Sequence, residues 1–120
     1  GIEMIDHVCL IVNNLEESRK YYERILNMES RESNTDSKTI LLENKEVHFF
    51  IIERDFPREY IEMQHISIQT ESIETKKQEL AEKGITELTT GEFRQFRYHN
   101  YKWIGWRDPD GIRLEYVESI

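Results

Sequence analysis

The chain has a single cysteine, Cys9, so no disulfide can form within its 120 residues. Cys9 stands in the apolar run of residues 8–12, where we expect a small buried side chain. No apolar stretch approaches the roughly 20 residues that a membrane-spanning helix needs. The beginning of the chain is not apolar enough for a signal peptide, because Glu3 and Asp6 interrupt it. These absences predict a cytoplasmic protein with one hydrophobic core.

Basic residues are in deficit, since 16 lysines and arginines face 24 aspartates and glutamates and the formal net charge is −8. Binding to nucleic acid or to an anionic membrane needs cations that neutralise phosphates, so the composition argues against both partners. A metal ion, or a neutral or cationic small molecule, fits the charge better, although such acidity also serves solubility alone. Glycine-rich phosphate loops, CxxC pairs and GxSxG elbows are missing from the sequence.

The chain begins with a pattern typical of a strand followed by a helix. Residues 4–12 are apolar in the manner of a strand, with alternate side chains on one face. Asn14 is a good N-cap residue, and Glu17 completes a pair that resembles a capping box. A helix should follow from Leu15 to about Leu26, because its apolar residues recur at helical spacing.

The same pattern returns 58 positions later. Residues 63–69 predict a strand, Ser72 falls where Asn14 stood, and a helix should run from Ile73 to about Lys83. Gly84 then fits a helix C-terminus, because glycine readily adopts the positive φ needed there. Three strand-like segments follow the helix in each half, at about 28–33, 38–43 and 46–53, and at about 85–90, 100–107 and 112–118.

Each half therefore reads as a βαβββ module, with module one at about 1–58 and module two at about 59–120. Two such modules in a chain of this length predict a single α+β domain. A strong turn signal, Asp108-Pro109-Asp110-Gly111, separates the last two strands. The segment 91–99 is expected to be a loop.

Four residues could hold a metal ion or move a proton. His7 and His65 occupy matched positions in the first strand of each module, Glu115 lies in the last strand, and His48 stands where the counterpart of Glu115 is expected. Pairing the modules about a pseudo-twofold axis would bring matched positions together. Two imidazoles and one carboxylate suit one divalent ion (Zn, Ni, Mn, Fe or Co) and leave positions open for a substrate. A single histidine in such a strand is more often a structural residue than a metal ligand, and a single glutamate is more often an ordinary exposed carboxylate.

Other polar and aromatic residues are candidates for substrate binding. Arg94, Tyr98 and His99 belong to the expected loop, where they could bind a polar or anionic substrate or face solvent. Trp103 and Trp106 fall on opposite faces of one strand, so at most one of them should line a pocket while the other packs. Trp103 is the candidate for the pocket.

Three segments resemble the vicinal oxygen chelate superfamily, also called the glyoxalase, bleomycin resistance protein and dioxygenase family: IDHVCLIVNNLEESRKYYERIL, MQHISIQT and RDPDGIRLEYVE. The resemblance implies two tandem βαβββ modules whose mixed sheets curve around a central cavity. It also implies a metal-dependent lyase or isomerase, similar to lactoylglutathione lyase, that acts on a small oxygenated substrate. By the family's pattern His7, His65 and Glu115 are the metal ligands, and Glu115 also moves a proton.

The resemblance leaves alternatives open. Glyoxalase I enzymes carry a fourth ligand, normally Glu, where this chain has His48, so His48 could be a ligand or a second acid–base. Bleomycin-resistance relatives bind a cationic drug without catalysis, and fosfomycin-resistance thiol transferases use three ligands. The family also implies a homodimer, often with each site assembled from both subunits.

Overall fold

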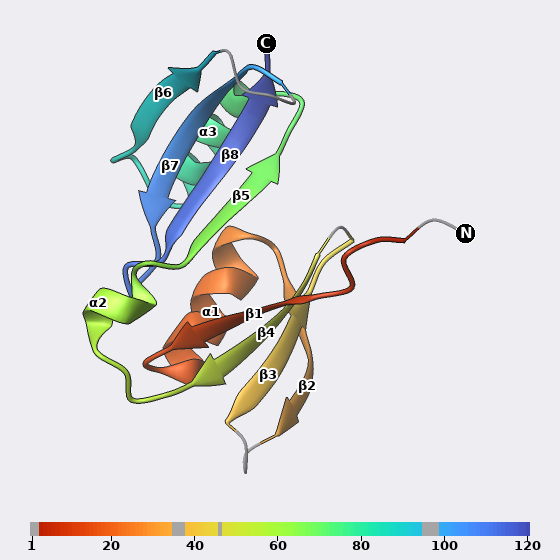
Figure 1. Ribbon diagram of the computed structural model, residues 1–120, viewed down its shortest axis with the longest axis vertical. Helices are drawn as coiled ribbons and strands as arrows, with labels where there is room; N and C mark the ends of the chain where they lie inside the picture. Colours follow the sequence, from red (N-terminus) through yellow and green to blue (C-terminus); the bar gives the residue numbers. More distant parts are fainter. Residues whose placement is uncertain (1–2, 35–37, 46, 95–98) are drawn as a thin grey trace.

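The computed structural model describes residues 3–34, 38–45, 47–94 and 99–120, which form two four-stranded mixed sheets, each backed by a helix (Figure 1). The strand orders are β1-β4-β3-β2 and β5-β8-β7-β6, and within the described ranges the sheets do not close into a barrel. The α+β fold of two βαβββ modules is confirmed. The elements are β1 (Val8–Val12), α1 (Leu15–Ile25), β2 (Glu29–Asn34), β3 (Thr39–Glu43), β4 (His48–Glu53), α2 (Arg58–Ile61), β5 (His65–Gln69), α3 (Ile73–Glu82), β6 (Thr89–Phe93), β7 (Tyr101–Arg107) and β8 (Arg113–Ser119).

Both modules use the same strand pairing and the same helix signals. The first and last strands of each module run parallel, and the other neighbours run antiparallel. The Asn14 side chain accepts a hydrogen bond from the Glu17 N–H at 2.9 Å, and the Ser72 hydroxyl accepts one from the Thr75 N–H at 3.2 Å. Gly84 follows α3 with a φ of 86°, as its position predicted.

A second helix cap, which the sequence did not predict, is duplicated as well. Glu53 at the end of β4 accepts a hydrogen bond from the Leu15 N–H, and Glu118 in β8 accepts one from the Ile73 N–H, both at 2.9 Å. These backbone hydrogen bonds hold the pKa of both carboxyls below the ordinary value for glutamate. The internal duplication therefore includes the way in which the last strand supports the helix.

One face of each sheet is buried beneath a helix. In β1, Leu10 and Val12 are buried, whereas Cys9 points to the other face and is exposed. The prediction of a buried Cys9 is therefore wrong, because alternate residues of a strand point to opposite faces. The core extends through both modules and includes Tyr22, Ile25, Leu42, Phe49, Ile51, Leu80, Trp106, Ile112 and Leu114.

The clearest differences from the prediction concern two strands and one additional helix. β1 begins later than expected, at Val8. β6 spans Thr89–Phe93 instead of 85–90, because Ile85 and Leu88 pack against the core before the strand starts. The short helix α2 was not predicted. None of the helices in the described ranges combines the length and the apolar character that crossing a bilayer requires.

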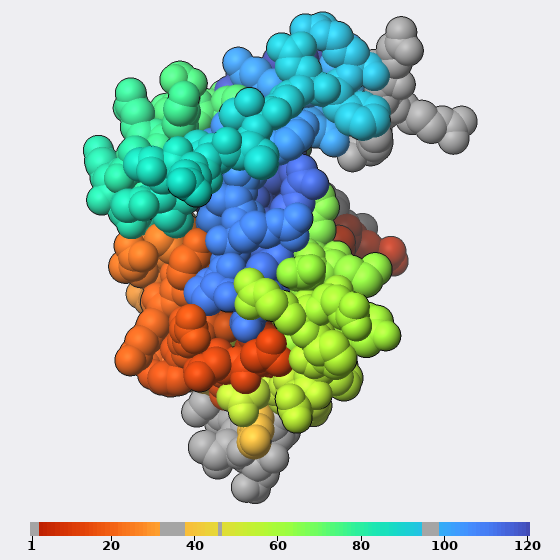
Figure 2. Space-filling view, turned by 90° about the vertical axis from the view of Figure 1, so that its left-hand side faces the viewer, coloured from red at the N-terminus to blue at the C-terminus, as the bar shows by residue number. Residues whose placement is uncertain are grey.

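The predicted Asp-Pro-Asp-Gly turn joins the two modules. Asp108 accepts hydrogen bonds from the N–H groups of Asp110 and Ile112, both at 2.9 Å, and from the Tyr22 hydroxyl of α1 at 2.6 Å. Asp110 accepts another from the Ser18 hydroxyl of α1 at 3.2 Å. Figure 2 shows the blue C-terminal residues seated between orange residues of module one and the yellow-green connection. The turn therefore fixes module two against α1.

Candidate metal centre and the adjoining cleft

Two of the predicted ligands, His65 and Glu115, lie side by side in module two. The pairing of β5 with β8 places His65 opposite Arg113 and Ser67 opposite Glu115. The His65 Nε2 lies 3.2 Å from the Glu115 Oε1, and the Ser67 hydroxyl donates a hydrogen bond of 2.7 Å to the same oxygen. The Glu115 side chain is 6% exposed, and that of His65 is 44% exposed. A buried carboxylate is thus held next to an accessible imidazole.

His7 immediately precedes β1 and lies apart from this pair in the single chain. Its Nδ1 is 2.8 Å from an Asp6 carboxylate oxygen, and its ring meets the Phe50 ring edge-on at a centroid distance of 4.8 Å. β1 is linked to module two at Ile11, whose N–H and carbonyl are bonded to the Gln64 side chain at 2.9 and 2.7 Å. His7 lies about 13 Å further back along the extended chain.

The expected convergence of three ligands inside one chain is not seen. Among the residues that the structure describes, no three His, Cys, Asp or Glu side chains lie close enough together to hold a metal ion. His65 and Glu115 supply an imidazole nitrogen and a carboxylate, which are donors that zinc and related divalent ions prefer. The donor types present fit such an ion, but the described part of one chain holds an incomplete set.

Strand pairing corrects the position assigned to His48. Cys9 of β1 and Ser67 of β5 occupy matching positions. Cys9 pairs with Phe50 in module one, and Ser67 pairs with Glu115 in module two. The counterpart of Glu115 is therefore Phe50, and His48 lies two residues earlier on the same face of β4. The His48 Nε2 is 3.0 Å from a Glu43 carboxylate oxygen, and the side chain is 45% exposed. A role for His48 as a ligand or acid–base stays a prediction.

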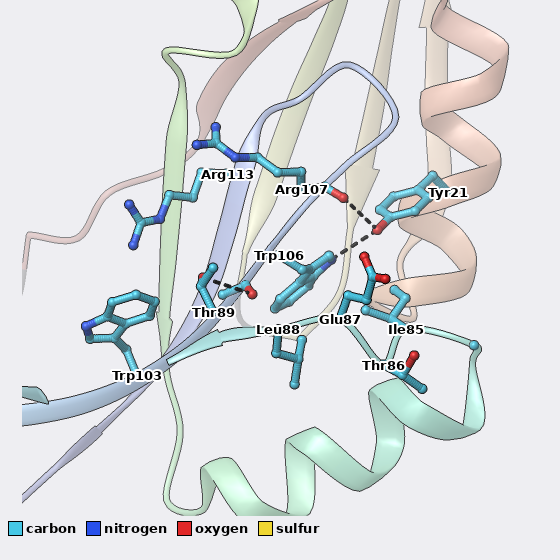
Figure 3. Close-up of a pocket in the computed structure, with 12 residues that line it drawn as sticks. Tyr21, Ile85, Thr86, Glu87, Leu88, Thr89, Trp103, Trp106, Arg107 and Arg113 are labelled. Carbon is cyan, nitrogen blue, oxygen red and sulfur yellow. Dashed lines mark hydrogen bonds between the residues drawn. The ribbon is translucent and has the colours of Figure 1, made fainter. Parts of the chain in front are cut away.

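A cleft of about 1030 Å³ opens next to the His65–Glu115 pair, where module two meets α1. Arg113 lines this cleft, and its guanidinium lies over the Trp103 ring at 4.9 Å from the centroid. The Arg113 Nη2 is also 3.3 Å from a Glu115 carboxylate oxygen, so one side chain connects the cleft with the pair. Figure 3 shows Arg113 and Trp103 at one end of the cleft.

Tyr21 lies towards the other end of the cleft, and Trp106 lies between Tyr21 and Trp103 (Figure 3). Trp106 is buried, stacks on Tyr116 at a centroid distance of 5.5 Å, and donates its N–H to the Tyr21 hydroxyl at 3.0 Å. Trp103 and Trp106 do point to opposite faces of β7, but both reach the cleft, so the expectation that only one would is wrong. Burial raises the pKa of Tyr21, which keeps its hydroxyl neutral.

Two other residues predicted to bind substrate, Arg94 and His99, do not line this cleft. Arg94 is 3.1 Å from Glu92, and the His99 Nδ1 is 2.8 Å from the Ser119 hydroxyl. Tyr98 lies outside the described residues, so its placement is not tested. Substrate binding by these three residues stays a prediction.

Sequence reasoning missed two residues that contact Glu115 directly, namely Ser67 and Arg113. Each lies two positions from a predicted ligand, Ser67 from His65 and Arg113 from Glu115. Because side chains two apart on a strand share a face, this spacing was a usable signal.

The chain matches the model of the Glyoxalase/Bleomycin resistance protein/Dioxygenase superfamily over residues 4–116. The integron cassette protein HFX_CASS4, from the mobile metagenome of Halifax Harbour Sewage Outfall, is 24% identical, with a TM-score of 0.75 over 98% of this chain and 99% of that chain. The virulence protein STM3117 from Salmonella typhimurium is 20% identical, with a TM-score of 0.74 over 99% and 98% of the two chains.

The fosfomycin resistance protein FosX from Listeria monocytogenes is 22% identical, with a TM-score of 0.72 over 100% of this chain and 94% of that chain. A FosX mutant complexed with Mn(II) and 1S,2S-dihydroxypropylphosphonic acid gives a TM-score of 0.71 at 22% identity, over 100% and 95% of the chains. These likenesses show the fold. Because the family match covers both βαβββ modules, the chain belongs to the glyoxalase/bleomycin resistance protein/dioxygenase superfamily.

Proposed function

We propose that this protein is a metal-dependent enzyme of the superfamily, a lyase or isomerase of the lactoylglutathione lyase type acting on a small oxygenated substrate. The observation that carries the proposal is the buried Glu115 carboxylate, 3.2 Å from the His65 imidazole. A bound divalent ion would act as a Lewis acid towards the vicinal oxygens of the substrate. Zn, Ni, Mn, Fe and Co are candidates, and the Mn(II) bound by FosX makes manganese the first ion to test.

Glu115 is the proposed proton-transfer residue. Its Oε1 accepts the Ser67 hydrogen bond at 2.7 Å, which restrains the orientation of the carboxylate. Because the side chain is almost fully buried, water competes poorly for the carboxylate. A positioned carboxylate of this kind can accept a proton from a substrate C–H or O–H and return it to a neighbouring atom.

We infer that His7 of a second copy of this chain completes the site. His7 is 42% exposed and lies on module one, whereas His65 and Glu115 lie on module two. A twofold-symmetric homodimer would form two equivalent sites, each with His7 from one copy and the other two ligands from its partner. Met4 and Ile5, which precede His7, are 83% and 85% exposed, as apolar residues of a subunit contact would be in an isolated chain.

Metal analysis of protein made without a histidine tag tests the ligand set. We expect one Mn(II) per chain after dialysis, and loss of the bound ion in the His7→Ala, His65→Ala and Glu115→Gln variants. His99→Ala is the matched control, because His99 lies outside the proposed set and should leave metal binding unchanged. Failure of the wild-type protein to bind any of the five candidate ions would refute the proposal.

Mixing two defective variants tests whether the site is shared between subunits. The His7→Ala and Glu115→Gln chains are unfolded together and refolded as a mixture, which produces heterodimers. In each heterodimer one of the two sites has all three ligands. Random pairing should therefore restore about a quarter of the wild-type metal content. A site formed within one chain predicts no restoration, since each chain would keep its own defect.

His48 is the second candidate for proton transfer, oriented by Glu43 at 3.0 Å. Replacement of His48 by Gln separates its two proposed roles. Unchanged Mn(II) affinity with slower turnover indicates an acid–base, whereas weaker affinity indicates a fourth ligand.

A second candidate function is fosfomycin-type thiol transfer to an epoxide. It is favoured by Arg113 next to Glu115, since a guanidinium is a good partner for a phosphonate. The likeness to the fosfomycin resistance protein FosX supports a fosfomycin-type substrate and does not identify the thiol as the nucleophile. Turnover of the hemithioacetal of methylglyoxal and glutathione, compared with turnover of fosfomycin and a thiol, distinguishes the two reactions. Metal-free binding of a cationic drug is the third alternative, and the two arginines that line the cleft disfavour it.

A further inference from the structure

We propose that Arg113 binds an anionic group of the substrate, a carboxylate, phosphonate or phosphate, beside the His65–Glu115 pair. The identification of the anion as part of a substrate rests on the proposed function. Its binding to Arg113 can be measured independently of any reaction.

The position of Arg113 is built into the sheet. Trp103 pairs with Gly91 across β6 and β7, and a Cβ added to Gly91 would lie 2.9 Å from three indole atoms. Glycine at this position lets the indole lie directly against the strand. The Arg113 guanidinium stands over the ring in a cation–π contact of 4.9 Å, and its side chain is only 35% exposed. The guanidinium is thus held in the cleft rather than extended into solvent.

The guanidinium of Arg113 has donors available for a ligand. It carries five N–H donors, and in the described part of the chain it meets only an aromatic ring and the Glu115 carboxylate, at 3.3 Å. Arg107, the other arginine of the cleft, instead donates to the backbone carbonyls of Glu62 and Gly111 at 3.2 and 2.9 Å. Arg107 therefore supports the turn, and Arg113 is the cation that can present a two-pronged contact to a carboxylate or phosphonate.

The local charge suits an anion although the whole chain is acidic. Two arginines and one glutamate line the cleft, in a chain whose formal net charge is −8. Repulsion by distant surface carboxylates is screened over about 10 Å at 0.1 M salt, so the nearby charges decide. A divalent ion held by Glu115 would more than offset that carboxylate and leave the neighbourhood of Arg113 positive.

The spacing of Arg113 and Glu115 limits the size of the substrate. The two residues lie two apart on one face of β8, about 7 Å along the strand, and their side chains converge, with the Arg113 Nη2 3.3 Å from a Glu115 carboxylate oxygen. One small molecule can therefore reach both if its anionic group lies two or three bonds from its reacting oxygens. Short hydroxy- or oxo-carboxylates and hydroxyphosphonates have this arrangement.

Binding of simple anions tests this assignment. Tryptophan fluorescence and calorimetry would follow titrations of chelator-treated protein with propylphosphonate, butyrate and uncharged butyramide at about 0.1 M salt, where distant surface charges are screened. We expect at least one of the two anions to bind and to change the emission of Trp103, and we expect butyramide to do neither. The anion that binds more tightly identifies the class of acid.

Variants of one arginine at a time locate the binding. Arg113→Gln should weaken the binding of the anion by about tenfold or more, because a charge-assisted hydrogen bond is lost. Arg113→Lys keeps the charge but lacks the planar guanidinium, so its anion affinity should lie between those of the wild type and Arg113→Gln. Arg31→Gln removes the same charge from an exposed ion pair with Glu29 and is the matched control, expected to bind as the wild type does.

Two results would overturn the assignment: butyramide binding as tightly as both anions, or Arg113→Gln binding them within twofold of the wild type. A repeat of the titrations after Mn(II) loading separates this inference from the proposed function. Absence of metal binding defeats the function while leaving the anion measurement intact. If the protein binds metal but the Arg113→Gln substitution does not change the anion affinity, only the role of Arg113 is refuted.

Discussion

The Tyr22→Phe variant tests the junction that holds the two modules together. The Tyr22 hydroxyl donates a hydrogen bond of 2.6 Å to the Asp108 carboxylate, and both residues are buried. Burial raises the pKa of Tyr22, so the hydroxyl remains a neutral donor. Phenylalanine keeps the ring in the core and removes only this donor. One oxygen of a buried carboxylate would then lack its hydrogen-bond partner.

The expected loss of stability follows from the charge of the acceptor. A hydrogen bond to a charged group contributes about 1.5–3 kcal/mol, so we expect a loss of about 2 kcal/mol in the free energy of unfolding near neutral pH. For a domain of this size such a loss lowers the Tm by about 8 °C. Urea unfolding should show a lower midpoint with an unchanged m value, since the surface exposed on unfolding is the same.

The loss should also depend on pH in a definite direction. Burial raises the pKa of Asp108 above its ordinary value of 3.8, while the Tyr22 hydrogen bond lowers it. The contribution of Asp108 to stability is therefore complete below 3.8 and is lost as the pH rises through the folded-state pKa. Removing the hydroxyl raises that pKa further, so the variant should lose more stability at about pH 7 than at about pH 4.

Tyr21→Phe is the matched control. Its hydroxyl accepts the Trp106 N–H at 3.0 Å and contacts no carboxylate in the described residues, so its loss should cost less and be insensitive to pH. The reasoning is wrong if Tyr22→Phe unfolds at the wild-type urea concentration. An equal loss at both pH values would likewise show that the charge of Asp108 does not matter.

Two further predictions concern the duplicated caps and the platform beneath Arg113. Glu53→Gln and Glu118→Gln should each lower the Tm modestly at neutral pH. The backbone hydrogen bonds lower the pKa of both carboxyls. The stability that these carboxylates add is therefore present above the ordinary pKa of 4.5 and is lost as the pH falls through the folded-state pKa. Thermal unfolding at several pH values should show the Tm of each variant converging with that of the wild type in acid. Gly91→Ala should displace the Trp103 indole, which a new Cβ would approach to 2.9 Å, and so shift tryptophan emission and weaken anion binding; an unchanged spectrum and affinity would contradict the proposed platform.

Local signals in the sequence determined the secondary structure and its repetition. Asn14 and Ser72 cap helices at positions 58 residues apart, and Gly84 ends the second helix, because these roles depend on the backbone within a few residues. The βαβββ order followed from the same short-range patterns. Helix α2 and the true start of β6 were missed, since contacts with distant residues override weak local preference there.

The tertiary structure alone decided which side chains meet. Pairing between strands far apart in the chain makes Phe50, not His48, the counterpart of Glu115, and separates His7 from His65 by the length of β1. Arg113 also lies over the Trp103 ring, although across β7 and β8 Arg113 pairs with Arg107 and Trp103 pairs with Val117. Strand register is fixed by long-range packing, and a shift of one residue moves every side chain to the opposite face. A repeat can therefore be recognised from the sequence, whereas the contacts of its side chains depend on a register that only the folded chain establishes.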